Sequence, residues 1–519
     1  MFFVRMSIIL IVIASWKLSR SPFWGNTPTT TTPRPTTTTS KPTTTAPPPK
    51  PTTTTPPPTT TTTPKPTTTT TTTTPKPTTT TPPPTKAPPK TTEAPPKQTI
   101  PIHEDIPSDT KPPPAPKLKV IKKGEEFIVV AETGASRLRK YYLKGERKGT
   151  WQVFLDNLPG HPDNLSPAED GFWVPLVAPS DKENPSLLGS LAKVPLVRKF
   201  LLRLVYLIQT PFRLISNAVP NVYTQKIYHA IGHFETSNWL FGPRVTILKV
   251  DWTGKIVAAL HGTDGQLGGI CHLLQVGEHY YLGSPFSKYM GRVKVPQHLM
   301  SKKESLRVFL QCDDVCFGFC RVGQPAELQG VLELNGYLNE GERLLEGRVH
   351  GPEHLLAVGG SIYTGIQGGE VIRINGDHIT HVAKFGAPCE GAYEEAKCGR
   401  PLGMSLDVKK DHLIVADAFY GIWQVNLVNG KKQLLVSMNQ EVKGTTPRRP
   451  KIANSVAVHS SGDIYWTDSC SDFGLDDGMF TMLANPAGRL IHYDRARNVS
   501  TTLIDEMLFA IFRITPCTL

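Results

Sequence analysis

The stretch DHLIVADAFYGIWQVNL (residues 411–427) carries the pattern on which the fold prediction rests. An apolar run is followed by a small and acidic turn, and then by a second apolar run that ends in polar residues. Short β-type runs separated by such turns are typical of adjacent antiparallel strands. The segment is therefore expected to form a strand pair.

The same kind of unit recurs along the chain at spacings of roughly 40 to 50 residues, which is the length of a propeller blade. Six such units predict an all-β protein, a six-bladed β-propeller with four antiparallel strands in each blade. Because each blade buries its faces only against its neighbours, the ring has to close to be stable. The five further units are EEFIVVAETGASRLRKYYL (125–143), GFWVPLV (171–177), HYYLGSPFSKYMGRVKV (279–295), GGSIYTGIQGGEVIRI (359–374) and GDIYWTDSCSDFG (462–474).

The extreme N-terminus has the features of a targeting signal. An apolar run from Met6 to Trp16 follows Arg5 and precedes Lys17. The run is shorter than the about 20 residues that a spanning helix needs. Residues 1–25 are predicted to be a signal peptide or an uncleaved signal anchor, and the rest of the chain is expected to enter the secretory pathway, at the cell surface or outside the cell.

Residues 26–115 are dominated by Thr, Pro and Lys, in units such as PKPTTTT. A tract with so few apolar side chains cannot offset the entropy cost of ordering its backbone. Proline favours an extended chain, and the dense threonines offer hydroxyls for O-linked sugars. The tract is predicted to be a disordered mucin-like stalk, with a linker that carries no sugar as the alternative.

The net charge of +13 lies mostly in this tract. Residues 1–100 contain eleven Lys or Arg and one acidic residue, so they contribute +10, and the remaining chain carries 13 − 10 = +3. A nucleic-acid-binding protein needs its basic residues on a folded surface. No nucleic-acid partner is expected.

Two groups of cysteines stand out. Cys389 and Cys398 flank a polar eight-residue loop and are predicted to form a disulfide, as suits the secretory pathway. Cys312, Cys316 and Cys320 have a CxxxCxxxC spacing, but no His or fourth Cys lies close enough to complete a metal site.

One segment departs from the β pattern. Residues 191–215 (LAKVPLVRKFLLRLVYLIQTPFRLI) are apolar with interspersed Arg and Lys, which predicts a helix inserted into a blade. Two interpretations have equal weight. The helix packs on the propeller as a lid, or it rests on a membrane with its basic residues at anionic head groups.

Several motifs resemble the strictosidine-synthase-like family. They include HGPEHLL (350–356), CGRPLG (398–403), YWTDSCSDF (465–473) and YYLGSPFSKYMGRVKV (280–295), and the resemblance covers most of residues 118–297 and 333–509. It implies the same six-bladed propeller and a site in its axial tunnel.

The two halves of the resemblance are in reversed order. Residues 116–297 resemble the C-terminal half of the family and residues 333–509 the N-terminal half, whereas 298–332 and 510–519 resemble neither. A circular permutation and a misassembled gene model both explain this order.

The resemblance also implies a Ca²⁺ ion in the tunnel, because many lactonase and arylesterase relatives hold one through oxygen-bearing side chains from several blades. By motif position these ligands are Glu353, Asn454, Asp163 and Asn164. A further ligand, the Asn of a Phe-Pro-Asn-Gly motif, falls at the break and is absent. Asn164 also begins a glycosylation sequon, but Asn498 is the expected acceptor.

The catalytic residue stays open. The glutamate with which the plant synthases condense an amine and an aldehyde has no counterpart before the strand at Tyr280, so this condensation is not expected. His272 is a candidate base, although a lone histidine there is more often structural.

Two functions follow. The first is a Ca²⁺-dependent arylesterase or lactonase that acts on a small ester or lactone. The second is a non-enzymatic mucin-type surface glycoprotein whose stalk sugars bind lectins or pathogens. In either case the membrane is a partner, through the N-terminal anchor or through segment 191–215.

Overall fold

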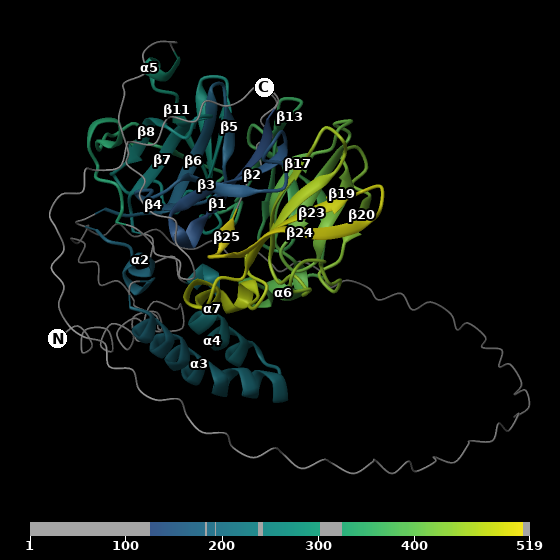
Figure 1. The fold of residues 1–519 in the computed structure, drawn as a ribbon. Coiled ribbons are helices and arrows are strands. Elements are labelled where there is room, and N and C mark those ends of the chain that lie inside the picture. The colour runs from purple at the N-terminus through teal and green to yellow at the C-terminus, as the bar shows by residue number, and fades with distance from the viewer. Residues whose placement is uncertain (1–124, 182–183, 193, 237–241, 301–323, 512–519) are drawn as a thin grey trace, which may run out of the picture. The chain divides into compact units, whose positions relative to one another are not determined.

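Six antiparallel sheets form a closed ring in the part of the chain that the computed structural model describes, which is residues 125–181, 184–192, 194–236, 242–300 and 324–511 (Figure 1). Each sheet contacts the next, and the sixth contacts the first through β22, β23 and β25. All described residues belong to the unit Thr110–Leu519. The predicted signal (1–25), the stalk (26–115) and the cysteine triplet at 312, 316 and 320 lie outside the described residues.

The six sheets are the blades of a six-bladed β-propeller, as predicted, and each of the six repeated units lies in a different sheet. In order along the ring, the strands are as follows: blade 1, β25 (Ala510–Ile511), β1 (Glu126–Glu132), β2 (Arg137–Lys144) and β3 (Trp151–Leu155); blade 2, β4 (Gly160–Pro162), β6 (Gly171–Pro179), β7 (Val245–Asp251) and β8 (Ile256–Gly262), with β5 (Ser166–Ala168) paired to β6; blade 3, β9 (His272–Val276), β10 (His279–Gly283), β11 (Met290–Lys294) and β12 (Glu342–Leu344); blade 4, β13 (Leu355–Val358), β14 (Ser361–Ile366), β15 (Glu370–Asn375) and β16 (His378–Lys384); blade 5, β17 (Pro401–Leu406), β18 (His412–Asp417), β19 (Gly421–Asn426) and β20 (Lys432–Val436); blade 6, β21 (Ala453–Val458), β22 (Ile464–Asp468), β23 (Gly488–Asp494) and β24 (Val499–Met507).

The hydrophobic core lies between the blades. The apolar run of β1 is buried along its whole length, and it packs with strands of blades 2 and 6 in one cluster. A strand that is buried on both faces needs a continuous apolar run instead of an alternating one, which is why FIVVA reads as it does. Leu332, at the end of the predicted junction 298–332, packs into the same cluster.

Two blades combine strands that are distant in the sequence. Blade 1 takes its first strand, β25, from the C-terminal part of the chain, and blade 3 takes β12 from beyond the junction. The Thr133 and Gly134 amides donate to the Phe509 and Leu508 carbonyls at 3.1 and 3.0 Å. The residues at 510 and 511 therefore supply a strand that closes the ring.

A helical layer is inserted between β6 and β7 of blade 2, and Figure 1 shows it below the ring. The predicted helix at 191–215 is confirmed, although the layer contains three helices, α2 (Leu187–Ala192), α3 (Pro195–Ala218) and α4 (Val222–Gly232). None of the helices in the described ranges combines the length and apolar character needed to cross a membrane. The remaining short helices are η1 (Thr133–Ala135), α5 (Gln297–Met300), η3 (Gly330–Leu332), η4 (Ala392–Glu394), α6 (Glu395–Cys398), η5 (Leu475–Asp477) and α7 (Gly478–Leu483).

Several contacts fix this layer to the propeller. The Tyr228 hydroxyl donates to Asp477 Oδ1 at 3.0 Å, and His233 Nε2 lies 3.2 Å from Glu395 Oε2, with both side chains buried. Glu395 lies within the loop closed by the Cys389–Cys398 disulfide, which confirms the predicted pairing. The orientation of the layer is therefore set by hydrogen bonds and a buried pair.

Candidate metal centre

Carboxylate and amide side chains from three blades meet at the inner strands of the ring. Asp163 and Asn164 directly follow β4, Glu353 lies two residues before β13, and Asn454 is the second residue of β21. Inner strands line the central channel of a propeller, so side chains that leave them converge on its axis.

Contacts across the ring locate the site. The Asn164 amide nitrogen Nδ2 lies 3.5 Å from Glu353 Oε1, and the Ser455 hydroxyl donates to Asn164 Oδ1 at 3.0 Å and approaches Asn454 Oδ1 at 3.2 Å. The contact between Asn164 and Glu353 joins blades 2 and 4, which blade 3 separates. The contact between Ser455 and Asn164 joins blades 6 and 2, which blade 1 separates. Groups from blades that are not neighbours meet only near the axis, so the four predicted ligands surround one central point.

The centre is buried and acidic. Asp163, Asn164, Glu353 and Asn454 are all buried. Burial, together with the charge of Glu353, raises the pKa of Asp163 well above its usual range. Burial also raises the pKa of Glu353 to about 7, against the opposing effect of Arg400, whose Nη2 lies 3.9 Å from Glu353 Oε2. Two buried carboxylates so close together disfavour each other's ionised form.

These residues fit a hard divalent cation. Asp163 Oδ1 is buried and has no hydrogen-bond partner among the described residues, so a ligand oxygen is available there. Two carboxylates and two amides supply the oxygen donors that Ca²⁺ prefers, and a cation would remove the repulsion between the acids. The donor set therefore agrees with the ion that the family resemblance implies.

Two members of the site were missed by sequence reasoning. Ser455 adjoins Asn454 in the same motif, and this adjacency was the available signal. Cys271 has no motif signal, yet its Sγ lies within 4.8 Å of ligand oxygens of Asp163 and Glu353. Burial raises the pKa of the Cys271 thiol, which contacts the Gly283 and Glu353 carbonyls at 3.6 Å. A protonated, soft thiol is a poor calcium ligand.

The backbone around Glu353 is tightly packed. A Cβ atom at Gly283 would lie 2.1 Å from the Glu353 carbonyl oxygen, which is closer than real contacts allow. The strand β10 of blade 3 therefore approaches the Glu353 backbone only because position 283 has no side chain.

Blade 1 contributes no ligand that the structure identifies among the described residues. Where the resemblance implies Phe-Pro-Asn-Gly, the chain reads Leu508-Phe509-Ala510, and residues 510 and 511 form β25. The predicted set is thus brought together from blades 2, 4 and 6, without the asparagine that the family supplies from this position.

His272 has a structural position. It is fully buried at the start of β9, and its Nδ1 accepts a hydrogen bond from the Leu355 amide at 3.3 Å. Its ring packs edge-on against His354, whose Nδ1 accepts from the Met404 amide at 3.1 Å. The two histidines link the inner strands of blades 3, 4 and 5. This arrangement favours the structural interpretation over the role of a base.

The two sequons differ in accessibility. Asn164 is 1% exposed, so a sugar on it is incompatible with this fold. Asn498 is exposed in the turn between β23 and β24, as the acceptor prediction requires.

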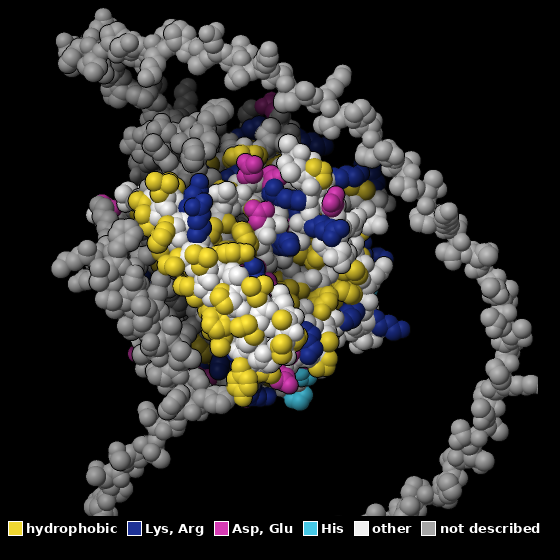
Figure 2. All heavy atoms as spheres, turned by 90° about the horizontal axis from the view of Figure 1, so that it is seen from below, with side chains coloured by type: hydrophobic (Ala, Val, Ile, Leu, Met, Phe, Trp, Pro, Cys, Tyr) yellow, Lys and Arg dark blue, Asp and Glu magenta, His cyan; other side chains and the backbone are white. Residues whose placement is uncertain are grey.

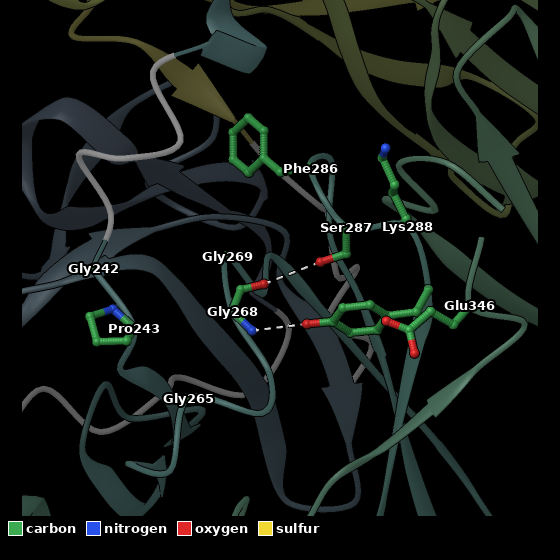
Figure 3. A pocket seen from close by; sticks show the side chains of 10 residues that line it. Gly242, Pro243, Gly265, Gly268, Gly269, Phe286, Ser287, Lys288 and Glu346 are labelled. Carbon is green, nitrogen blue, oxygen red and sulfur yellow. Dashed lines mark hydrogen bonds between the residues drawn. The ribbon is translucent and has the colours of Figure 1, made fainter. Parts of the chain in front are cut away.

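A separate pocket of about 530 Å³ opens beside loops of blades 2 and 3 (Figure 3). Its glycine-rich wall is fixed by the Gly268 amide, which donates to the Tyr289 hydroxyl at 3.2 Å, and by the Ser287 hydroxyl, which donates to the Gly268 carbonyl. Lys288 and Glu346 are its charged lining residues. No residue of the candidate metal centre lines it.

The fold and this centre define a six-bladed propeller with a buried acid–amide site on its axis. Comparison with known proteins shows a resemblance to one family. Residues 330–374 match the family model "Strictosidine synthase-like, N-terminal", and residues 454–511 match "Strictosidine synthase". The chain is similar to the strictosidine-synthase-like family over these two segments, and both lie in the second half of the chain.

Curated relatives carry related names. The chain is 55% identical over 190 residues to adipocyte plasma membrane-associated protein Hemomucin of Drosophila melanogaster, covering 36% of this chain and 33% of that protein. It is 37% identical over 193 residues to adipocyte plasma membrane-associated protein of Salmo salar, covering 36% and 45%. The matches thus span between a third and a half of these relatives. A crystal structure of a nidogen/laminin complex aligns with TM-score 0.40 and 10% identity, over 76% of this chain and 99% of that one.

Proposed function

We propose that this propeller is a calcium-dependent hydrolase of small esters or lactones. The observation that carries the proposal is the meeting of Asp163, Asn164, Glu353 and Asn454 on the axis, where Asp163 Oδ1 is buried and has no hydrogen-bond partner among the described residues. A calcium ion held by these residues would polarise an ester carbonyl or activate water.

The protein's own residues prepare the site in three ways. Glu353 and Asp163 supply the negative charge, and their burial excludes water from the donor atoms. Ser455 orients the Asn164 and Asn454 side-chain oxygens by donating toward them. Arg400 lies against Glu353 and reduces the cost of its charge.

The test is hydrolysis of phenyl acetate and of a γ-lactone by the chain after EDTA treatment, with and without added CaCl₂. We expect activity that depends on calcium, and loss of at least 100-fold in Glu353→Gln. Glu342→Gln is the matched control, since Glu342 lies exposed on blade 3. Equal rates with calcium and with EDTA would contradict the proposal.

The alternative is a mucin-type surface glycoprotein with the propeller as a scaffold. Two features support it: the ligand missing from blade 1 and the similarity to a protein named Hemomucin. It predicts lectin binding that is lost when O-linked sugars are removed, with no hydrolysis of either substrate.

A further inference from the structure

The outer face of the helical layer has an unusual composition. The sequence from Leu187 to Gly232 contains six Lys or Arg and no Asp or Glu. Helix α3 nevertheless has large apolar side chains around most of its circumference, and Figure 2 shows apolar side chains gathered on the face seen from below.

The four most exposed apolar residues of α3 lie in one line. Leu196 and Leu207 are 80% and 68% exposed, and Phe200 and Leu214 are 56% and 60% exposed. At 3.6 residues per turn these four positions fall within about 40° of each other around the helix axis. They form a continuous apolar stripe along the helix.

The opposite side of α3 faces the propeller. Its buried residues are Leu201 and Gln209, about a third to half a turn away from the stripe. The Gln209 amide lies 3.5 Å from Asp477 Oδ1, and the ring of Tyr206 meets Phe480 edge-on. The propeller therefore already covers one side of the helix, and the stripe points away from it.

Helix α4 extends the apolar surface. Tyr223 is 69% exposed, and Val222 and Ile227 are also exposed. The Asn221 side chain caps the helix by accepting from the Thr224 amide at 3.0 Å, so the chain turns sharply between α3 and α4. The two helices present one surface, here called the helical face: the exposed apolar residues of α3 and α4.

Basic residues surround the helical face. Lys199, Arg203 and Lys226 are exposed, and Arg203 lies in line with the α3 stripe. The layer therefore combines apolar side chains with adjacent Lys and Arg, and its sequence contains no carboxylate. This composition matches the boundary of a bilayer, where acyl chains adjoin phosphates. A soluble protein partner would need to supply acidic groups of its own. A second copy of this surface has none in the sequence of its helical layer.

We propose that the helical face docks on a phospholipid bilayer, with α3 and α4 in the interface plane and their Lys and Arg side chains at the level of the phosphates. The inference does not depend on the catalytic proposal. It assigns the partner of segment 191–215 to the membrane, in place of a lid.

The buried pair His233–Glu395 and the Tyr228–Asp477 hydrogen bond hold the face in a fixed orientation. Arg400 links this joint to the metal centre, because its guanidinium lies 3.5 Å from Glu395 and 3.9 Å from Glu353. Docking would therefore place a defined end of the propeller against the membrane.

The first experiment measures partition of the full chain onto vesicles of phosphatidylcholine with phosphatidylglycerol. The combined variant Leu196→Ser, Phe200→Ser, Leu207→Ser and Leu214→Ser is expected to bind at least tenfold more weakly. The matched control is Val428→Ser with Leu434→Ser, two exposed apolar residues of blade 5, which should bind as the wild type does. Lys199→Glu with Arg203→Glu should weaken binding at low salt more than at high salt.

A second experiment locates the contact independently of folding. The Leu207→Trp variant keeps an apolar residue in the stripe, and the fluorescence of the introduced indole should be quenched by brominated phospholipids. Val428→Trp should add no quenching above the native tryptophans. Unchanged partition of the four-serine variant, or no added quenching in the Leu207→Trp variant, would overturn the proposal, because binding would then arise elsewhere in the chain. A dimer in sedimentation that the serine variant dissolves would overturn it in favour of self-association.

Discussion

The Glu132 carboxylate accepts a hydrogen bond at 2.9 Å from the Leu508 amide, 376 residues later in the chain. Glu132 is fully buried, and its other contacts are Arg139 and Arg137, at 2.6 and 2.5 Å. These charges lower its pKa in spite of burial. One side chain thus joins β1 to the segment that closes the ring, and it does so as a buried anion.

Replacement of Glu132 should open this closure. Glu132→Ala leaves the buried Arg139 unpaired and the Leu508 amide without its acceptor, so we expect a loss of about 3–5 kcal/mol in the free energy of unfolding. Urea unfolding measures it. Glu342→Ala removes an exposed carboxylate paired with Arg292 and should cost less than about 1 kcal/mol. Equal losses in the two variants would show that Glu132 is not central to closure.

Glu353→Gln should have opposite effects with and without calcium. Burial raises the pKa of Glu353 to about 7, so at pH 8 folding buries an already ionised carboxylate beside Asp163. In EDTA the variant loses that repulsion and should be more stable than the wild type by about 1–3 kcal/mol. Calcium at about 100 times its Kd should stabilise the wild type by about 2.7 kcal/mol and leave the variant unchanged. A calcium-dependent rise in Tm that persists in the variant would exclude Glu353 as a ligand.

Ionisation of Asp417, which lies outside the metal centre, is expected to make the stability of the fold depend on pH. Its Oδ1 accepts the Phe419 and Tyr420 amides at 3.0 and 2.9 Å, whereas its buried Oδ2 has no hydrogen-bond partner in the described part of the chain. Burial raises its pKa to about 7. Because the folded-state pKa lies above the unfolded value, its contribution to stability is full below about pH 4 and is lost as the pH rises through 7.

Asp417→Asn keeps the Oδ1 acceptor and removes the charge. At pH 8 it should stabilise the fold by up to about 4 kcal/mol relative to the wild type, with little or no gain at pH 4. Unfolding in urea at the two pH values checks this. A gain of the same size at both would rule out ionisation as its cause.

The disulfide supports the joint of the helical layer. Removing Cys389–Cys398, which closes a loop with a sequence separation of 9, should cost about 2–3 kcal/mol in the double serine variant. Glu395 lies inside that loop, so the contact with His233 should loosen as well. Thermal unfolding and limited proteolysis measure the two effects. Wild-type protein in reductant should behave like the variant, and a difference between them would point to the serines themselves.

The sequence was sufficient for the blades because each one carries its own signal. The segments 125–143 and 411–427 each contain the sequence pattern of a strand, a turn and a second strand. Six such units could therefore be recognised without knowledge of their contacts. The disulfide was also predictable, because its two cysteines lie close together in the sequence. Helix α4 was missed, because its shorter pattern, VYTQKIYHAIG, mixes polar and apolar residues without a clear stripe.

The centre was predictable only in part. Glu353, Asn454, Asp163 and Asn164 were identified by motif resemblance, whereas the role of Ser455 depends on a contact between blades 2 and 6 that no local spacing encodes. Cys271 enters the site because its strand begins there, not because of a cysteine pattern. The use of residues 510 and 511 as a closing strand follows from ring geometry, and the tail itself gives no such indication.

The pairing of β25 with β1 also determines when this protein is able to finish folding. The β1 edge is synthesised early, but its partner strand β25 follows only after blades 2 to 6. During translation at about 5–20 residues per second, that edge stays unpaired for roughly 20 to 80 seconds. An apolar strand with an open edge is a template for aggregation. Biogenesis of this chain should therefore depend on chaperones far more than that of a propeller whose blades each complete in turn.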